Sequence, residues 1–163
     1  MKKIIIAALA VFCLSTTAAE AAGGRCYAPK EVEAEQGIRI HSELMVIGLT
    51  CMKMPGGPEN YSRYQQFTQK NSKLIAQYET DLISHYRKTG VKGAEIKLHT
   101  LRTNMANEIS QHAIAMSTST FCRKFSPRIP QALAMDKPHL RAWAQHVWPG
   151  TPTSEPICKV SKK

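Results

Sequence analysis

Apolar residues recur at alternating steps of three and four in the segment that leads to Met52. They form two adjacent stripes, one with Ile38, Met45 and Met52 and the other with Ile40, Leu44, Ile47 and Cys51. Two such stripes make one wide apolar face, which predicts a helix that is covered by partners on more than one side. Arg39 and Glu43 lie opposite this face, one turn apart, where we expect them to pair on the solvent side. This helix, predicted over about residues 30–52, is the expected centre of the fold.

The pattern predicts further helices separated by clear breaks. Two prolines and two glycines between residues 53 and 58 end the first helix. An aromatic-rich stripe then predicts a helix over about 59–88, and another apolar stripe predicts one over about 94–121. A short helix is predicted over about 137–146, and the proline-rich residues 148–163 are expected to form an extended tail. Short connections make consecutive helices antiparallel, so the expected fold is an all-α, up-down-up bundle with a shorter fourth helix.

The start of the chain is typical of a secretory signal peptide. Lys2 and Lys3 precede an apolar run from Ile4 to Leu14, and Ala19 and Ala21 are the small residues of a cleavage site. We therefore predict a signal at residues 1–21 and a single helical domain at 22–163. No later stretch is long and apolar enough to span a membrane, so the mature chain is expected to be periplasmic or secreted.

Export changes the interpretation of the cysteines. Removal of the signal takes Cys13 away and leaves Cys26, Cys51, Cys122 and Cys158, an even number that predicts two disulfides in an oxidising compartment. In an up-down-up bundle the first and third helices end at the same pole, which pairs Cys51 with Cys122. Cys26 and Cys158 then pair at the opposite pole. Each bridge is expected to contribute on the order of 2–4 kcal/mol.

The charge is strongly and unevenly positive. The chain has 22 Lys and Arg against 12 Asp and Glu, a net charge of +10, and the predicted mature part is at +9. Most of the excess follows Phe121, in Arg123, Lys124, Arg128, Lys137, Arg141, Lys159, Lys162 and Lys163. Such a basic region fits an acidic protein or an anionic envelope surface as partner, and it equally fits a solvated tail that keeps the chain soluble. Nucleic acid is not expected as a partner.

Three polar side chains interrupt the apolar stripes at one expected depth of the bundle. Folding the helices back at their turns places His41, Asn71 and His112 at the same level, one on each long helix. A buried hydrogen-bonded layer that fixes helix register is one interpretation. A metal or small-ligand site is the other, with His41 and His112 as donors and Met45 and Met116 nearby, a soft ligand set that suits copper.

Helical phase argues against the metal site. At about 100° per residue, each histidine lies roughly 80° around its helix from the cysteine that joins the two helices, so the two rings turn toward opposite sides. We therefore assign no metal, no cofactor and no catalytic residue.

Enzymatic chemistry has no local signature in this chain. It contains only two aspartates and no GxSxG, no glycine-rich phosphate loop and no HExxH. The sequence favours an exported, non-catalytic interaction protein that binds another protein or an anionic envelope component. The alternatives are a small-ligand or copper carrier that uses the polar layer, and an enzyme without a recognisable motif.

Overall fold

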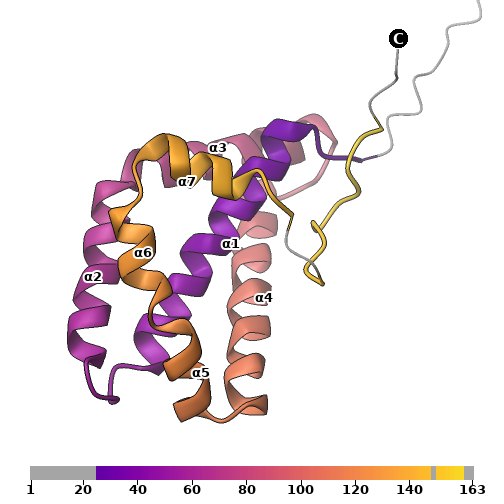
Figure 1. The fold of residues 1–163 in the computed structure, drawn as a ribbon. Coiled ribbons are helices and arrows are strands. Elements are labelled where there is room, and N and C mark those ends of the chain that lie inside the picture. The colour runs from indigo at the N-terminus through magenta and orange to yellow at the C-terminus, as the bar shows by residue number, and fades with distance from the viewer. Residues whose placement is uncertain (1–24, 148–149, 160–163) are drawn as a thin grey trace, which may run out of the picture.

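We describe the protein from a computed structural model, which covers residues 25–147 and 150–159. The fold is all-α, as predicted, and its helices follow one another with short connections (Figure 1). They are α1 (Pro29–Thr50), α2 (Gly57–Lys70), α3 (Ser72–Lys88), α4 (Ala94–Ala115), α5 (Thr118–Phe125), α6 (Arg128–Ala134) and α7 (Lys137–Ala144). The predicted signal at 1–21 lies outside the described residues.

Helix α1 passes through the middle of the molecule and packs against every other helix (Figure 1). Nearly every residue from Val32 to Gly48 is buried, whichever side of the helix it occupies. The wide apolar face therefore does mark the central helix. Its opposite face is covered as well, so Arg39 and Glu43 are buried and the expectation that they pair in solvent is wrong.

The predicted helix over 59–88 is two helices that meet at Asn71. This residue ends α2 and precedes α3, with backbone angles of −105° and 11°. Its side-chain amide donates to the carbonyl of Phe67 at 3.0 Å, a local bond with which asparagine competes against regular helix. Helix α3 then crosses the end of the bundle, where it packs on α1 and α4.

The predicted helix over 94–121 also ends early. Helix α4 stops at Ala115, and Ser117 adopts a positive φ of 70°, which no helix accommodates. The chain turns there into the short helices α5 and α6. Helix α6, which the sequence analysis did not anticipate, packs along α2.

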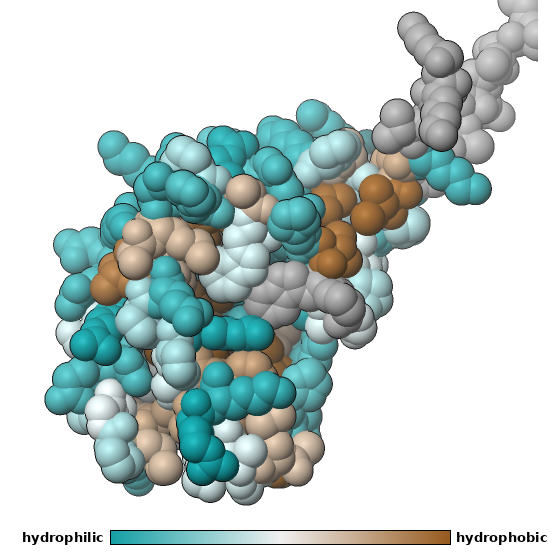
Figure 2. Space-filling view, viewed as in Figure 1, coloured by the Kyte–Doolittle hydropathy of each residue, from teal (hydrophilic) through white to brown (hydrophobic). Residues whose placement is uncertain are grey.

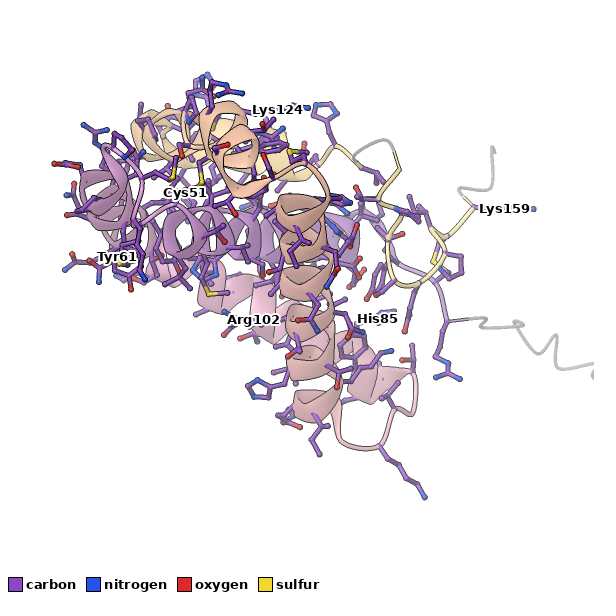
Figure 3. All side chains as sticks on the ribbon, turned by 90° about the horizontal axis from the view of Figure 1, so that it is seen from below. Cys51, Tyr61, His85, Arg102, Lys124 and Lys159 are labelled. Atoms are coloured by element: carbon purple, nitrogen blue, oxygen red, sulfur yellow. A yellow bond between two sulfur atoms is a disulfide. The ribbon has the colours of Figure 1, made fainter. Side chains whose placement is uncertain are left out.

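Both predicted disulfide pairs, Cys51–Cys122 and Cys26–Cys158, are confirmed. They lie at opposite ends of the molecule, since Cys51 ends α1 whereas Lys159, next to Cys158, lies at the far side in Figure 3. Two disulfides are consistent with an oxidising, extracytoplasmic compartment. None of the described helices has the length and apolar character that a membrane span requires.

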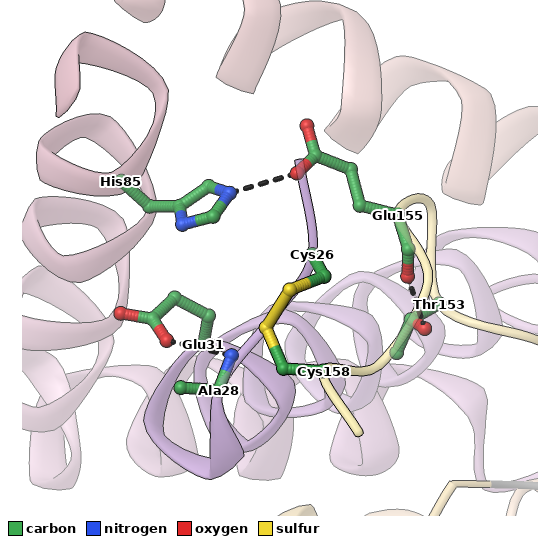
Figure 4. The surroundings of a disulfide bond; sticks show 7 residues. All are labelled: Cys26, Ala28, Glu31, His85, Thr153, Glu155 and Cys158. Carbon is green, nitrogen blue, oxygen red and sulfur yellow. Dashed lines mark hydrogen bonds and ion pairs between the residues drawn. A yellow bond between two sulfur atoms is a disulfide. The ribbon is translucent and has the colours of Figure 1, made fainter. Parts of the chain in front are cut away.

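The described part of the tail, residues 150–159, is fastened to the start of α1; we call it the C-terminal segment. Tyr27 donates its amide to Pro156 at 2.8 Å and accepts from the amide of Cys158 at 2.9 Å. His85 and Glu155 form a buried pair at 2.7 Å beside the Cys26–Cys158 bridge (Figure 4). The segment is thus held by side chains of α1 and α3 as well as by sulfur.

The face of the molecule shown in Figure 2 is covered mainly by hydrophilic side chains. The largest exposed apolar residues, Leu49, Ile96, Ile114, Val147 and Ile157, come from distant points of the described chain. Single exposed apolar residues of this kind are normal on soluble surfaces.

Candidate functional site

The structure does not assemble the predicted layer of His41, Asn71 and His112. His41 is buried against α2, where its Nε2 lies 3.2 Å from the hydroxyl of Thr68 and 3.4 Å from that of Tyr64. Asn71 is buried and bonded within its own turn, whereas His112 is exposed on α4. Because His112 is exposed, the three side chains do not form one buried layer.

The predicted metal donors are also separated. Met45 and Met116 are partly buried and pack on the core, and the two histidines face different helices. Within residues 25–147 and 150–159, no group of three His, Cys, Asp or Glu side chains is close enough to hold a metal ion.

A small cavity instead lies against Arg39 and Glu43 of α1. It has a volume of about 150 Å³, and residues of α4, α5, α6 and the C-terminal segment complete its wall. We call it the Arg39–Glu43 pocket. Its further lining residues are Glu108, Ile109, His112, Phe121, Phe125, Arg128 and Thr151. Arg39 and Glu43 reach the same wall because residues four apart share one helix face.

Two ion pairs that join distant parts of the chain hold the charged wall in place. Arg39 donates from Nη1 to Glu108 at 3.1 Å, and Glu43 pairs with Arg128. Arg39 and Glu43 are only 7% and 6% exposed. Each nevertheless retains one buried atom without a hydrogen-bond partner in the described part of the chain, Nε of Arg39 and Oε2 of Glu43. Such atoms are rare in folded proteins, since each costs about 1–3 kcal/mol.

Two phenylalanines contribute an apolar part of the remaining wall. Phe121 and Phe125 are one turn apart on α5, with ring centroids separated by 4.9 Å. The guanidinium of Arg128 lies 4.9 Å from the Phe125 ring centroid, a cation–π contact that fixes both side chains. The pocket therefore combines apolar and strongly polar side chains, the usual character of a small-molecule site.

Burial perturbs the carboxyl group of this pocket. It raises the pKa of Glu43 above its ordinary value, even though the positive charges of Arg128 and Arg39 oppose the change. An additional hydrogen-bond donor at Oε2 would therefore stabilise the ionised carboxylate. A raised pKa in a cleft is a common property of functional sites.

The sequence analysis missed this pocket because Arg39 and Glu43 were assigned to solvent. A usable signal was nonetheless present: the two charges sit within a segment that is apolar enough to be covered on several sides. Charged residues of such a segment are rarely buried without partners, and an arginine partner for Glu43 was available in the basic C-terminal part of the chain.

Comparisons with known protein families, with curated proteins and with solved structures found no match to this chain. The site is therefore interpreted from its own chemistry. A guanidinium and a carboxylate that line one cavity can bind an acceptor and a donor of the same small molecule.

Proposed function

We propose that this protein is an exported, non-catalytic carrier of a small molecule that binds in the Arg39–Glu43 pocket. One observation carries the proposal: two charged side chains, more than nine-tenths buried, line a cavity and each keeps an unsatisfied hydrogen-bonding atom. A ligand that supplies an acceptor to the guanidinium of Arg39 and a donor to the carboxylate of Glu43 would add charge-assisted hydrogen bonds to this pair.

The polar pair favours a small zwitterion or hydroxy acid. A carboxylate is the natural partner of the guanidinium, and an ammonium or hydroxyl group is the natural partner of Glu43. Because Arg39 and Glu43 are one helical turn apart, one α-amino or α-hydroxy acid can contact both. Its side chain then lies against the apolar wall of Phe121 and Phe125.

The volume limits the size of the ligand. Sites for drug-sized molecules span about 300–1,000 Å³, so this pocket of about 150 Å³ takes a smaller one. An apolar cavity of about 150 Å³ in another protein holds benzene, which sets the scale of a suitable apolar group. Valine, leucine and their 2-hydroxy analogues are within this limit.

Calorimetric titration of the oxidised, secreted protein tests the proposal. The panel is alanine, valine, leucine, 2-hydroxyisovalerate and, as an uncharged control, isobutanol. We expect saturable binding of at least one acid and a higher melting temperature in its presence. Glu43→Gln should weaken that binding about 10- to 100-fold, the range expected for a charge-assisted hydrogen bond.

The matched control is Arg102→Gln, which breaks the Arg102–Glu79 pair of α4 and α3 away from the pocket and should leave affinity unchanged. Phe125→Leu is a second variant, which keeps both charges and should weaken valine more than alanine. A panel without binding overturns the proposal, and so does equal affinity of the wild type and Glu43→Gln. In the first case the pocket holds only water.

The binding of another protein or of an anionic envelope component stays a prediction. Part of the positive charge is offset within the fold, because Arg128 and Arg141 pair with the buried carboxylates of Glu43 and Glu33. Lys162 and Lys163 lie outside the described residues.

A further inference from the structure

A second, strongly charged cleft lies at the other side of α1, between α1, α3 and α7. Its volume is about 460 Å³. Four cationic side chains line it, Lys30, Lys73, Lys137 and Arg141, together with two carboxylates, Glu33 and Asp81. We call it the α3–α7 cleft. It shares no lining residue with the Arg39–Glu43 pocket.

Both carboxylates of the cleft are already paired with a cation of the cleft. Glu33 accepts from Tyr78 at 3.1 Å, from Arg141 at 2.7 Å and from Gln145 at 3.0 Å. Burial opposes its ionisation, but these hydrogen bonds bring the pKa of Glu33 below its ordinary value. Asp81 accepts from Lys30 at 2.7 Å and from Gln77 at 2.8 Å. Lys30 and Arg141 thus offset the two negative charges of the cleft.

Two of the cations are free. Lys73 and Lys137 are exposed, and neither has a hydrogen-bond or ion-pair partner within the described part of the chain. They come from different helices, α3 and α7, and both also line the smaller hollow of about 330 Å³ that adjoins the cleft. The fold thus brings two unpaired ammonium groups to one concave surface, beside the guanidinium of Arg141.

We infer that the α3–α7 cleft binds a phosphate group. Its four cations and two carboxylates leave a net charge of about +2, which matches the −1.5 to −2 of a phosphomonoester near pH 7. Lysine ammonium groups bind phosphate as point charges, and guanidinium nitrogens add directed donors. A carboxylate would neutralise only half of this charge. The inference is independent of the ligand in the Arg39–Glu43 pocket.

The phosphate has two possible sources, a soluble phosphomonoester and a phospholipid headgroup, and two arms of one experiment separate them. In the first, the oxidised protein is titrated with inorganic phosphate and, as a comparison, with acetate at equal ionic strength. In the second, it is sedimented with phosphatidylcholine vesicles that contain or lack phosphatidic acid. The test variant is Lys73→Gln/Lys137→Gln, which removes only unpaired surface charges. The control is Lys88→Gln/Lys97→Gln, which changes net charge equally on exposed residues outside the cleft.

We expect phosphate to bind at least tenfold more tightly than acetate, and we expect the test variant alone to lose at least tenfold in affinity. If the test variant alone also loses retention on phosphatidic acid vesicles, the headgroup is the source. If vesicle retention is absent while phosphate binding is lost in the test variant alone, the source is soluble. Equal losses in the two double variants, equal binding of acetate, or no binding in either arm overturns the inference.

Discussion

Protonation of His41 provides a direct test of the packing around the central helix. The ring is 6% exposed, is bonded through Nε2 to Thr68, and has no partner for Nδ1 within the described chain. Burial, helped by the positive charge of Arg102, lowers the pKa of His41 from 6.5 to about 4. His41 is therefore neutral in the folded protein at every pH above that value.

The sign and size of the effect follow from linkage. Below about pH 6.5 the unfolded chain binds a proton at His41 that the folded chain does not bind, so acid favours unfolding. Stability from this residue is fully present above pH 6.5, is lost as the pH falls toward 4, and changes no further below it. Each tenfold difference in proton affinity is about 1.4 kcal/mol, so the loss is roughly 3 kcal/mol.

Urea unfolding at pH 7, 6, 5 and 4 measures this loss in wild type and in His41→Gln. The glutamine retains hydrogen-bonding capacity but does not titrate. Carboxylates elsewhere titrate equally in both proteins, so the difference between the two free energies of unfolding isolates His41. We expect that difference to shrink by roughly 3 kcal/mol between pH 7 and pH 4. His99→Gln, at an exposed position of α4, is the control. Parallel curves for wild type and His41→Gln would refute the argument that the ring is held neutral by burial.

Three further predictions concern α1 and its bridge. A Cβ at Gly37 would lie 2.2 Å from a buried tyrosine ring, so Gly37→Ala should lower the free energy of unfolding by about 1–3 kcal/mol in urea. Gly48→Ala is the control: its nearest contact would be 3.3 Å, so its stability should stay within about 1 kcal/mol of wild type. Gln36 is fully buried with both amide atoms unsatisfied, so Gln36→Met should raise the free energy of unfolding by about 1–3 kcal/mol, and a decrease would contradict this reasoning. Replacing Cys51 and Cys122 together by alanine removes one disulfide and should lower the free energy of unfolding by about 2–4 kcal/mol. The measurement is the melting temperature under non-reducing conditions, which should be lower in this variant than in the wild type.

The disulfide pairing was predictable because it depends on coarse features. Helix directions and the poles at which cysteines fall are insensitive to errors of a few residues. Whether His41, Asn71 and His112 form one buried layer was not predictable, because the answer depends on the exact register of three helices against one another. The bend at Asn71 arises from a bond to the carbonyl of Phe67, while the apolar stripe continues across it without interruption.

The burial of Arg39 and Glu43 illustrates a different limit. A helical pattern separates an apolar face from a polar one, and it assumes that the polar face meets water. Helix α1 is covered on every side, so its charges need partners from later helices. Those partners, Glu108 and Arg128, are 69 and 85 residues away along the chain, and no local pattern links them.

The buried charges of α1 divide into two kinds, and the division bears on function. Glu33 receives three hydrogen bonds, and Glu35 receives two from Ser154 of the C-terminal segment, so both are saturated by the fold. These contacts fix α7 and the C-terminal segment against the central helix. Arg39 and Glu43 fix α4 and α6 in the same way, yet they keep unsatisfied atoms and line a cavity. Gln36 and His41 of the same helix also keep unsatisfied atoms without lining this cavity, so it is the position of Arg39 and Glu43 on the cavity wall that distinguishes them, and the ligand titration tests whether that position serves binding.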